Sequence, residues 1–397
     1  MKSLFIIISV FFLTSFYSFS QRINIGIYST TNVKTFVFTP TNGNYTFIGD
    51  TNFVREITEN DVLYVAVLGE KVTIKTLDEN YGNFREILLI GQSQDCSFKI
   101  KPVFPDITTR EYDNDLRVFV KYSFLMLVNH VELESYISGV VESEGGGNAH
   151  LEYYKSQAII CRTYALANIN RHAGEGFNLC DGVHCQAYFN KSVKNEKIPT
   201  ATQLTRGLII VDTTLSLITA AFHSNCGGQT ANSEDVWLSK LSYCRSINDY
   251  YCRSSRNAEW KTTITVSEWI NYLKKNGITV PENTVAQDFA FAQTSRKVYY
   301  SFNNQNIQLK KIRADWKLKS TFFSIVPEGN NLVLNGKGFG HGVGLCQEGA
   351  MKMANTGFTY DQIIKFYYKN TYTISLRALE FFKEPVKIHP EETESMP

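Results

Sequence analysis

The amino-acid sequence predicts an α+β protein, built mainly of antiparallel β-sheet with a helical segment in mid-chain and short closing helices. From Gln21 to about Tyr122, apolar and polar residues alternate in short runs separated by turn-forming residues, which is typical of antiparallel strands. From Leu133 onwards, apolar residues recur every three or four positions, the period of a helix. Hydrophobic residues make up 43% of the 397 residues and charged residues 20%, which excludes long disorder and a polytopic membrane protein.

These changes of pattern set the expected boundaries. We expect a β-rich region over residues 21–122, a second domain over 123–378 and a loose tail over 379–397. Glycines at 145, 146 and 147 should end the first helix, because glycine loses much backbone entropy inside a helix. Helices are predicted over 133–144, 151–169, 266–276, 347–354 and 360–368, and strands within 204–222 and 298–333.

The N-terminus predicts export. Lys2 precedes an apolar run from Leu4 to Phe19, and Ser18 and Ser20 are the small residues of a cleavage site, so residues 1–20 are expected to be a secretory signal peptide. The alternative is an uncleaved anchor. Lys and Arg total 40 against 38 Asp and Glu, a net charge of +2, so no broad charged surface for nucleic acid or an anionic membrane is expected. We therefore expect a secreted, periplasmic or cell-envelope protein.

Eight cysteines suit an oxidising compartment. Their pairing cannot be read from the sequence, because eight cysteines allow 105 connectivities. Cys244 and Cys252 bracket a short Tyr-rich loop and form the disulfide that we predict from spacing.

Glu144 is the most informative carboxylate. It extends the apolar stripe of Leu133, Tyr136 and Val140, whereas Glu134 and Glu142 fall on the other side of the helix. Removal from water raises the pKa of a carboxyl group, and a protonated carboxyl group can cleave a glycosidic bond as a general acid. The alternative is a glutamate at the end of the helix that points into solvent.

Arg162 falls on the buried stripe of the second helix. A buried guanidinium needs an anion. A direct bond to Glu144 would lower the pKa of that carboxyl group and oppose an acid role, so we expect an anionic group of the substrate as partner. A structural pair with Asp181 or another acid is the alternative.

The run from Cys180 to Tyr188, together with His172, supplies two thiols and two imidazoles. Three of these groups would suit zinc and leave room for a fourth ligand. The alternative is a disulfide between Cys180 and Cys185, which an exported chain would readily form.

Two stretches are dense in small and polar residues. The first runs from Phe222 to Thr230. In the second, glycines alternate from Gly338 to Gly344 and would leave one face of an extended segment bare, so that a sugar ring could approach the backbone, with His341 on the opposite side. Taken alone, each histidine is more often structural than catalytic.

Five segments, in this order, resemble the stage II sporulation protein D family and the LytB-type amidase enhancers. The likeness covers roughly residues 120–375 and extends loosely into the N-terminal strands. The matching segments are residues 136–144, residues 155–165 with Lys155-Ser156-Gln157-Ala158 and Arg162-Thr163-Tyr164-Ala165, His184-Cys185-Gln186, residues 223–228, and residues 340–350 with Gly340-His341-Gly342-Val343-Gly344, with Tyr367-Tyr368 closing the pattern.

The resemblance implies an exported lytic transglycosylase that cuts peptidoglycan glycan strands freed of stem peptides. The family's catalytic glutamate falls on Glu144, and its metal site, zinc in some members, falls on Cys180, Cys185 and His172. The free lactyl carboxylate of such strands is the expected partner of Arg162. The full set of residues expected to bind substrate is Arg162, Tyr164, Gln186, Tyr188, His223, Ser224, Asn225, His341 and Gln347.

Two departures from the family's pattern stand out. Residues 145–148 replace the usual Met-Pro and Trp-Pro stretch, and Cys226 and Cys346 stand where the family commonly has serine, which suggests a disulfide between them. The competing function is a non-catalytic module that binds glycan and stimulates a cell-wall amidase. A cysteine or zinc hydrolase built on His184 and Cys185 is weaker, because thiols committed to metal or disulfide are not free nucleophiles.

Overall fold

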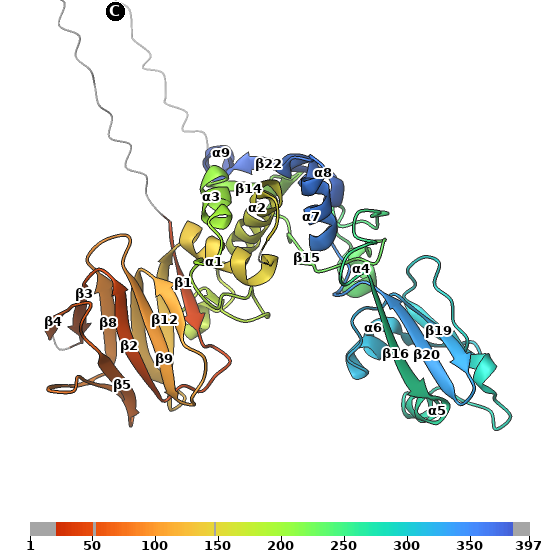
Figure 1. Cartoon of the computed structure of the whole chain (residues 1–397), viewed down its shortest axis with the longest axis horizontal. Coiled ribbons are helices and arrows are strands. Elements are labelled where there is room, and N and C mark those ends of the chain that lie inside the picture. The colour runs from red at the N-terminus through yellow and green to blue at the C-terminus, as the bar shows by residue number, and fades with distance from the viewer. Residues whose placement is uncertain (1–20, 51–52, 147, 384–397) are drawn as a thin grey trace, which may run out of the picture.

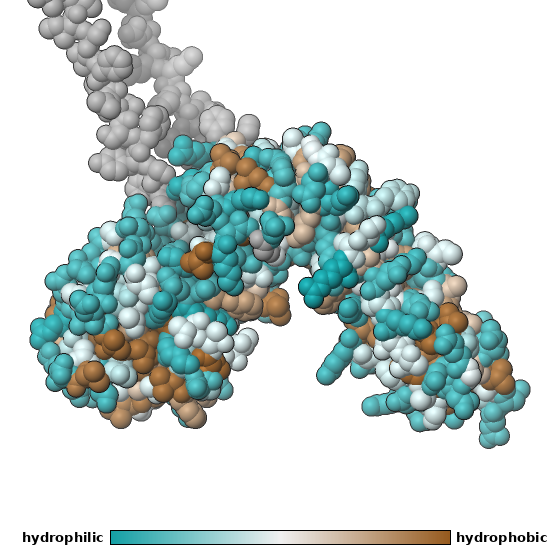
Figure 2. Space-filling model, viewed as in Figure 1, coloured by the Kyte–Doolittle hydropathy of each residue, from teal (hydrophilic) through white to brown (hydrophobic). Residues whose placement is uncertain are grey.

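The computed structural model describes residues 21–50, 53–146 and 148–383. The predicted signal peptide and residues 384–397 of the predicted tail lie outside these ranges. None of the described helices combines the length and the apolar content that crossing a bilayer requires. Three regions succeed one another along the molecule: a β-sandwich, a central region rich in helices, and a smaller lobe (Figure 1). On the face seen in Figure 2, an open hollow separates the sandwich from the lobe.

The sandwich consists of two mainly antiparallel sheets. A seven-stranded sheet has the order β13-β1-β12-β11-β8-β3-β4, and a six-stranded sheet has the order β10-β9-β2-β5-β6-β7. Phe38 of the six-stranded sheet and Tyr45 of the seven-stranded sheet are fully buried. Their rings pack edge to face with centroids 5.4 Å apart. The strands are β1 (Arg22–Ile27), β2 (Thr35–Asn42), β3 (Tyr45–Gly49), β4 (Val54–Ile57), β5 (Leu63–Leu68), β6 (Lys71–Lys75), β7 (Asn80–Phe84), β8 (Glu86–Gly91), β9 (Ser97–Phe104), β10 (Arg110–Asp113), β11 (Asp115–Lys121), β12 (Phe124–Glu132) and β13 (Leu179–Cys180).

The central region begins as β12 passes directly into α1 (Leu133–Gly145), followed by α2 (Leu151–Ala167). Helix α1 ends as predicted: Gly146 follows it with φ 74°, a left-handed conformation that favours glycine. The predicted helices at the other end of the chain are confirmed as α7 (Gln347–Asn355) and α8 (Tyr360–Tyr367). The remaining elements here are η1 (Ala173–Glu175), α3 (Lys197–Leu204), β14 (Leu208–Asp212), β15 (Phe222–His223), α4 (Ser233–Val236), β21 (Leu345–Cys346), β22 (Thr371–Ser375) and α9 (Leu376–Lys383).

The lobe is an insertion between β15 and β21. Its first and last strands, β16 (Glu259–Thr265) and β20 (Asn331–Lys337), pair antiparallel with Glu259 opposite Lys337, so the chain leaves and returns at one place. A separate core surrounds the fully buried Trp269. The other elements of the lobe are the predicted helix α5 (Val266–Lys275), η2 (Ala286–Phe289), β17 (Tyr299–Phe302), β18 (Gln305–Gln308), α6 (Leu309–Asp315) and β19 (Phe323–Glu328).

The α+β prediction is confirmed, but some elements differ from the expectation. Helix α6 lies inside the stretch that we predicted to be strands, because Leu309 and Ile312, three residues apart, both face the core of the lobe. Helix α3 was also not expected. The sandwich continues through β12 to Glu132, beyond the expected boundary at residue 122.

Candidate active site

Glu144 lies in the last turn of α1 with a partly buried side chain. Burial raises the pKa of Glu144, and the backbone N–H of Ala187, which donates to its Oε1 at 2.8 Å, offsets part of this increase. This increase in pKa agrees with the position of Glu144 on the apolar stripe of the helix. The structure therefore provides a carboxyl group that keeps its proton to a higher pH than an exposed glutamate.

Two segments distant in sequence hold Glu144 in place. The segment that follows Cys185 supplies the N–H of Ala187, and the Gln347 side chain at the start of α7 donates to the backbone carbonyl of Glu144 at 3.0 Å. The first segment also crosses α1 at Gly139, where a Cβ atom would lie 2.5 Å from the Asn190 carbonyl oxygen. Gly139 thus permits the close crossing that brings Ala187 to Glu144.

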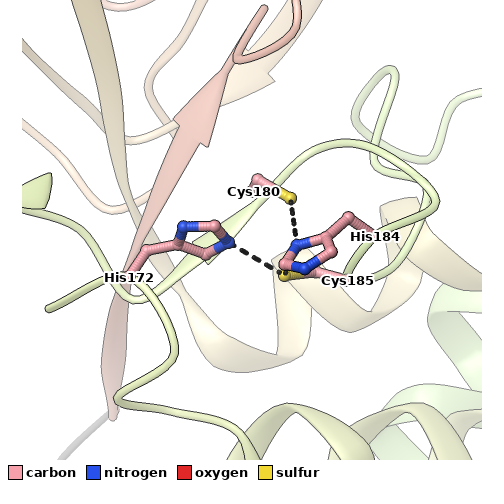
Figure 3. A group of neighbouring side chains, drawn as sticks. All are labelled: His172, Cys180, His184 and Cys185. Carbon is pink, nitrogen blue, oxygen red and sulfur yellow. Dashed lines mark hydrogen bonds between the residues drawn. The ribbon is translucent and has the colours of Figure 1, made fainter.

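A cluster of two thiols and two imidazoles lies just before this segment (Figure 3). Cys185 Sγ is 3.5 Å from His172 Nε2, and His184 Nδ1 is 3.8 Å from both Cys180 Sγ and Cys185 Sγ. All four ligand atoms lie within 4.8 Å of one another. We call His172, Cys180, His184 and Cys185 the first cluster.

Both long-range and local contacts position the first cluster. Cys180 ends β13, which pairs parallel with β1, so this ligand is anchored to the sandwich. The next residue, Asp181, accepts hydrogen bonds from the backbone of Tyr28 and Ser29, and pairs with Arg110 at 2.7 Å. Glu175 lies 2.6 Å from His172 Nδ1 and orients that ring so that Nε2 faces the thiols.

The donor set of the first cluster fits zinc. Two sulfurs and two imidazole nitrogens are a common tetrahedral set for this ion, and the carboxylate behind His172 is a usual partner of such a ligand. The sequence predicted three of these ligands and left room for a fourth. The structure places His184 at the position of the fourth ligand, which the sequence pattern alone did not single out.

The expectation that Arg162 binds substrate is wrong. Its guanidinium is fully buried: Nε donates to Glu134 Oε1 at 2.9 Å, Nη2 donates to the other carboxylate oxygen, and Nη1 donates to the Leu208 carbonyl at 3.0 Å. Glu134, expected on the polar side of α1, is itself buried. The alternative of a structural pair is therefore correct, with Glu134 as the acid.

Tyr188 is also not placed to meet a substrate. It is fully buried, its hydroxyl donates to Asn129 Oδ1 at 3.2 Å, and its ring packs against Tyr136. Gln186 is buried too, and the hydroxyl of Tyr136 donates to its Oε1 at 3.4 Å. Tyr164 is only half-buried, and its hydroxyl accepts from Arg171 at 2.7 Å beside the first cluster.

The predicted residues of the 222–230 stretch are mostly structural. Asn225 is buried, and its side-chain amide donates to the Cys252 carbonyl, Ser255 and Glu348. Half-buried Ser224 accepts from Asn257 at 3.3 Å. The roles predicted for these residues in substrate binding remain unsupported by the geometry, and Asn225 in particular has no exposed surface to offer.

His223 and His341 stand side by side with ring centroids 5.4 Å apart. Burial lowers the pKa of His341 to about 4 and that of His223 well below its ordinary value, so both rings are neutral near pH 7. His223 Nδ1 lies 3.1 Å from the Val343 carbonyl, and His341 Nδ1 accepts from the Val343 N–H at 3.0 Å. Among the hydrogen bonds of the described residues, Gln347 is the one predicted substrate-binding residue that bonds to Glu144.

The glycine-rich segment is not the bare extended surface that we predicted. Gly338, Gly340, Gly342 and Gly344 all have positive φ, between 72° and 114°, so the backbone turns repeatedly. The space beside it is filled: a Cβ atom on Gly338 would lie 2.5 Å from the Asn225 carbonyl oxygen. These glycines allow two protein segments to pack closely, and protein atoms fill the space that their missing side chains leave.

Neither predicted disulfide is present. All eight cysteines lie in the described part of the chain, and each is a free thiol. Cys252 does not pair with Cys244; it lies 3.4 Å from Cys226, measured between sulfurs. Cys226 and Cys346 do converge, as expected, but the contact is a hydrogen bond from the Cys226 N–H to Cys346 Sγ at 3.3 Å.

The fold and this site define a class of protein: an α+β chain in which a helix ends at a partly buried glutamate beside a cluster of two cysteines and two histidines. Comparison with known proteins agrees. The sequence profile of the family described as "Stage II sporulation protein" matches residues 121–211, which hold α1, α2, Glu144 and the first cluster.

Similar proteins extend the match. Stage II sporulation protein D of Bacillus amyloliquefaciens is 30% identical over 258 residues, covering 61% of this chain and 74% of the relative. The Bacillus subtilis protein of the same name is 29% identical over 62% of this chain and 75% of the relative. An "Amidase enhancer" of Bacillus subtilis is 25% identical over 59% of this chain and 40% of the relative. The chain belongs to the stage II sporulation protein D family.

Proposed function

We propose that this protein is an exported cell-wall enzyme that cuts peptidoglycan glycan strands by lytic transglycosylation. Family membership supports a role in the cell wall. The observation that carries the enzymatic proposal is Glu144, a partly buried carboxyl group whose pKa burial raises and which no cation of the described residues is shown to pair with. A module that only binds glycan has no use for such a group.

Glu144 alone accounts for the chemistry. Its protonated carboxyl group donates to the oxygen that links N-acetylmuramic acid to N-acetylglucosamine, and the bond between that oxygen and C1 breaks as positive charge develops at C1. The 6-hydroxyl of the same muramic residue then attacks C1, and the Glu144 carboxylate takes its proton. The products are a free 4-hydroxyl and a 1,6-anhydro end. No water is consumed, so a second carboxylate is not required.

The N–H of Ala187 serves this cycle. It lies 2.8 Å from Oε1 and stabilises the carboxylate form after the first proton transfer. Oε2 is then the oxygen left to exchange the proton with the substrate. Gln347 fixes the backbone at the same residue, so the carboxyl group has little freedom to turn away.

A zinc ion in the first cluster would be held by His172, Cys180, His184 and Cys185 and would have a structural role. Four protein ligands leave no position for water or substrate, which is typical of structural zinc. Its contribution would be to fix Cys185, two residues before Ala187. The same closed set of ligands disfavours a cysteine or zinc hydrolase.

Substrate choice needs a receptor other than Arg162, which is committed to Glu134. Preference for strands freed of stem peptides therefore stands on the family resemblance alone. The second candidate function, a glycan-binding enhancer of a cell-wall amidase, is favoured by the name of the Bacillus subtilis relative.

Mass spectrometry of digested glycan separates these functions. Purified strands without stem peptides are incubated with the wild-type chain, with Glu144→Gln and with Glu132→Gln. Glu132 precedes the same helix, and its side chain makes no capping bond, so it is a matched control. We expect anhydro products, one water lighter than hydrolysis products, with wild type and Glu132→Gln, and a loss of about 100-fold or more with Glu144→Gln. Equal cleavage by Glu144→Gln would reject the role of Glu144, and strand binding without cleavage by wild type would indicate the enhancer.

A further inference from the structure

A second group of metal-binding side chains lies in the interior of the central region, away from the first cluster in sequence. Cys226 follows β15, Asp249 and Cys252 lie in one loop, and Cys346 ends β21. The four ligand atoms lie within 4.8 Å of one another, and all four residues are 0% exposed. We call these residues the second cluster.

The distances in the second cluster suit a tetrahedral ion. Cys226 Sγ lies 3.4 Å from Cys252 Sγ and 3.3 Å from Asp249 Oδ2. Ligands bound to zinc at about 2.3 Å for sulfur and about 2.1 Å for oxygen lie roughly 3.5–3.8 Å apart at the corners of a tetrahedron. A disulfide would need sulfurs about 2.0 Å apart and would leave one of the three thiols unpaired.

The surroundings match those of a metal site. Tyr367 donates its hydroxyl to Asp249 Oδ2 at 2.9 Å, and the N–H of Tyr251 donates to Oδ1 at 2.9 Å, so the carboxylate is oriented from both sides. Gly349 in α7 is required here, because a Cβ atom at this position would collide with that carboxylate and with the Tyr367 hydroxyl. The N–H of Cys226 donates to Cys346 Sγ at 3.3 Å, so this sulfur is also held in place.

A divalent cation would also balance the charge of these ligands. When they bind a metal as three thiolates and a carboxylate, they carry four negative charges, which the interior of a protein holds only with compensation. Arg296 reaches from the lobe to the Cys226 carbonyl, where its Nη2 donates at 2.7 Å, and so supplies one positive charge nearby. A divalent ion would supply two more.

We infer that Cys226, Asp249, Cys252 and Cys346 bind a second structural metal ion, of which zinc fits best. Soft thiolate ligands select zinc over magnesium or calcium, and a fully buried set of four leaves no open position for catalysis. The ion would tie together the two strands between which the lobe is inserted, and it would fix Cys346, the residue before Gln347. This inference does not rest on the proposed function, because its readout is metal content.

Metal content tests the inference. The chain is purified under reducing conditions with ZnCl₂, desalted, and measured by elemental analysis and native mass spectrometry, alongside Cys180→Ser for the first cluster, Cys346→Ser for the second, and Cys96→Ser as a control. Cys96 is a buried thiol of the sandwich outside both clusters. We expect one zinc fewer with Cys346→Ser than with wild type, and no loss with Cys96→Ser. Unchanged zinc content in Cys346→Ser would overturn the inference.

A second measurement holds even if Cys346→Ser fails to fold. The Cys180→Ser chain, whose first cluster is disabled, is loaded with CoCl₂, and its absorption spectrum is recorded. We expect the strong thiolate-to-cobalt and tetrahedral bands of a site with three sulfurs, which Asp249→Asn in the same background weakens or shifts. Absence of these bands, or a Cys226–Cys252 disulfide that peptide mapping finds in the chain purified under reducing conditions with ZnCl₂, would overturn the inference.

Discussion

A residue that closely follows each cluster contacts Glu144, but the two clusters are assembled differently. The first cluster draws its four ligands from residues 172–185, a single connection after α2, and leaves His184 exposed. The second draws on three segments, two of which, at Cys226 and Cys346, are 120 residues apart, and it is wholly buried. A contact with Glu144 lies just after each: the Ala187 N–H after Cys185, and the Gln347 side chain after Cys346.

This difference implies that metal-binding side chains would serve two structural purposes if both clusters bind an ion as proposed. With a metal bound, the first cluster would stiffen one connection, which is itself anchored to β1 through Cys180 and Asp181. With a metal bound, a cluster built from distant segments would hold separate parts of the fold together, and Arg296 of the lobe donates to the Cys226 carbonyl at 2.7 Å. The following experiments test whether the two clusters differ in this way.

The largest expected effect is selective loss of metal. Dialysis of the zinc-loaded chain against EDTA should empty the first cluster and leave the second occupied, because His184 is exposed whereas every ligand of the second cluster is buried. Zinc content measured over time should fall to about half of its starting value and then stay there. Simultaneous loss of both ions would contradict the contrast in burial.

The second effect is on stability. Cys346→Ser should lower the free energy of unfolding more than Cys180→Ser, by several kcal/mol, because the binding energy of a structural metal is folding energy and the second cluster joins distant segments. Urea unfolding followed by circular dichroism measures both, with Cys96→Ser as reference. Equal losses, or a larger loss for Cys180→Ser, would show that the second cluster does not contribute more to the free energy of unfolding than the first.

A smaller effect is expected at the link between the second cluster and Glu144. Gln347→Ala removes the hydrogen bond to the Glu144 carbonyl, which is worth about 1 kcal/mol, or roughly a fivefold fall in glycan cleavage. Zinc content should not change. The exposed Gln203→Ala in α3 is the matched control. A loss of metal with Gln347→Ala would mean that this residue supports the cluster rather than the glutamate.

The smallest effect is the pH dependence of stability at Glu144. Burial raises its pKa above the unfolded value of about 4.3, so its contribution to stability is fully present below that pH and is lost as pH rises through the folded pKa. Glu144→Gln should therefore be more stable than wild type at pH 8, with the advantage disappearing near pH 4. Thermal unfolding at several pH values measures this, and a constant difference across pH would indicate that Glu144 is hydrated.

Much of the site near α1 could be predicted from sequence. The position of Glu144 on the apolar stripe and the end of α1 at the glycines follow from periodicity, and the presence of two thiols and two imidazoles follows from short spacing. The choice of His172, Cys180 and Cys185 as ligands came from the family resemblance. Arg162 was misassigned because its partner, Glu134, lies on a face of α1 that looked polar, and only packing against α3 and β14 buries that face. The prediction of a bare surface at the glycines from 338 to 344 was wrong for the same reason, because spacing cannot show which segment fills the space beside them.

The sequence by itself determined the fold class, the helix that carries Glu144 and the thiol-rich connection after α2, because each depends on interactions between residues close along the chain. Only the tertiary structure decided that Arg162 is internally paired and that Cys226, Asp249, Cys252 and Cys346 meet at one point. The physical reason is that these contacts join different elements of the fold: Arg162 and Glu134 are 28 residues apart and Cys226 and Cys346 are 120 apart. Such side chains meet only through packing, and no local period records that contact.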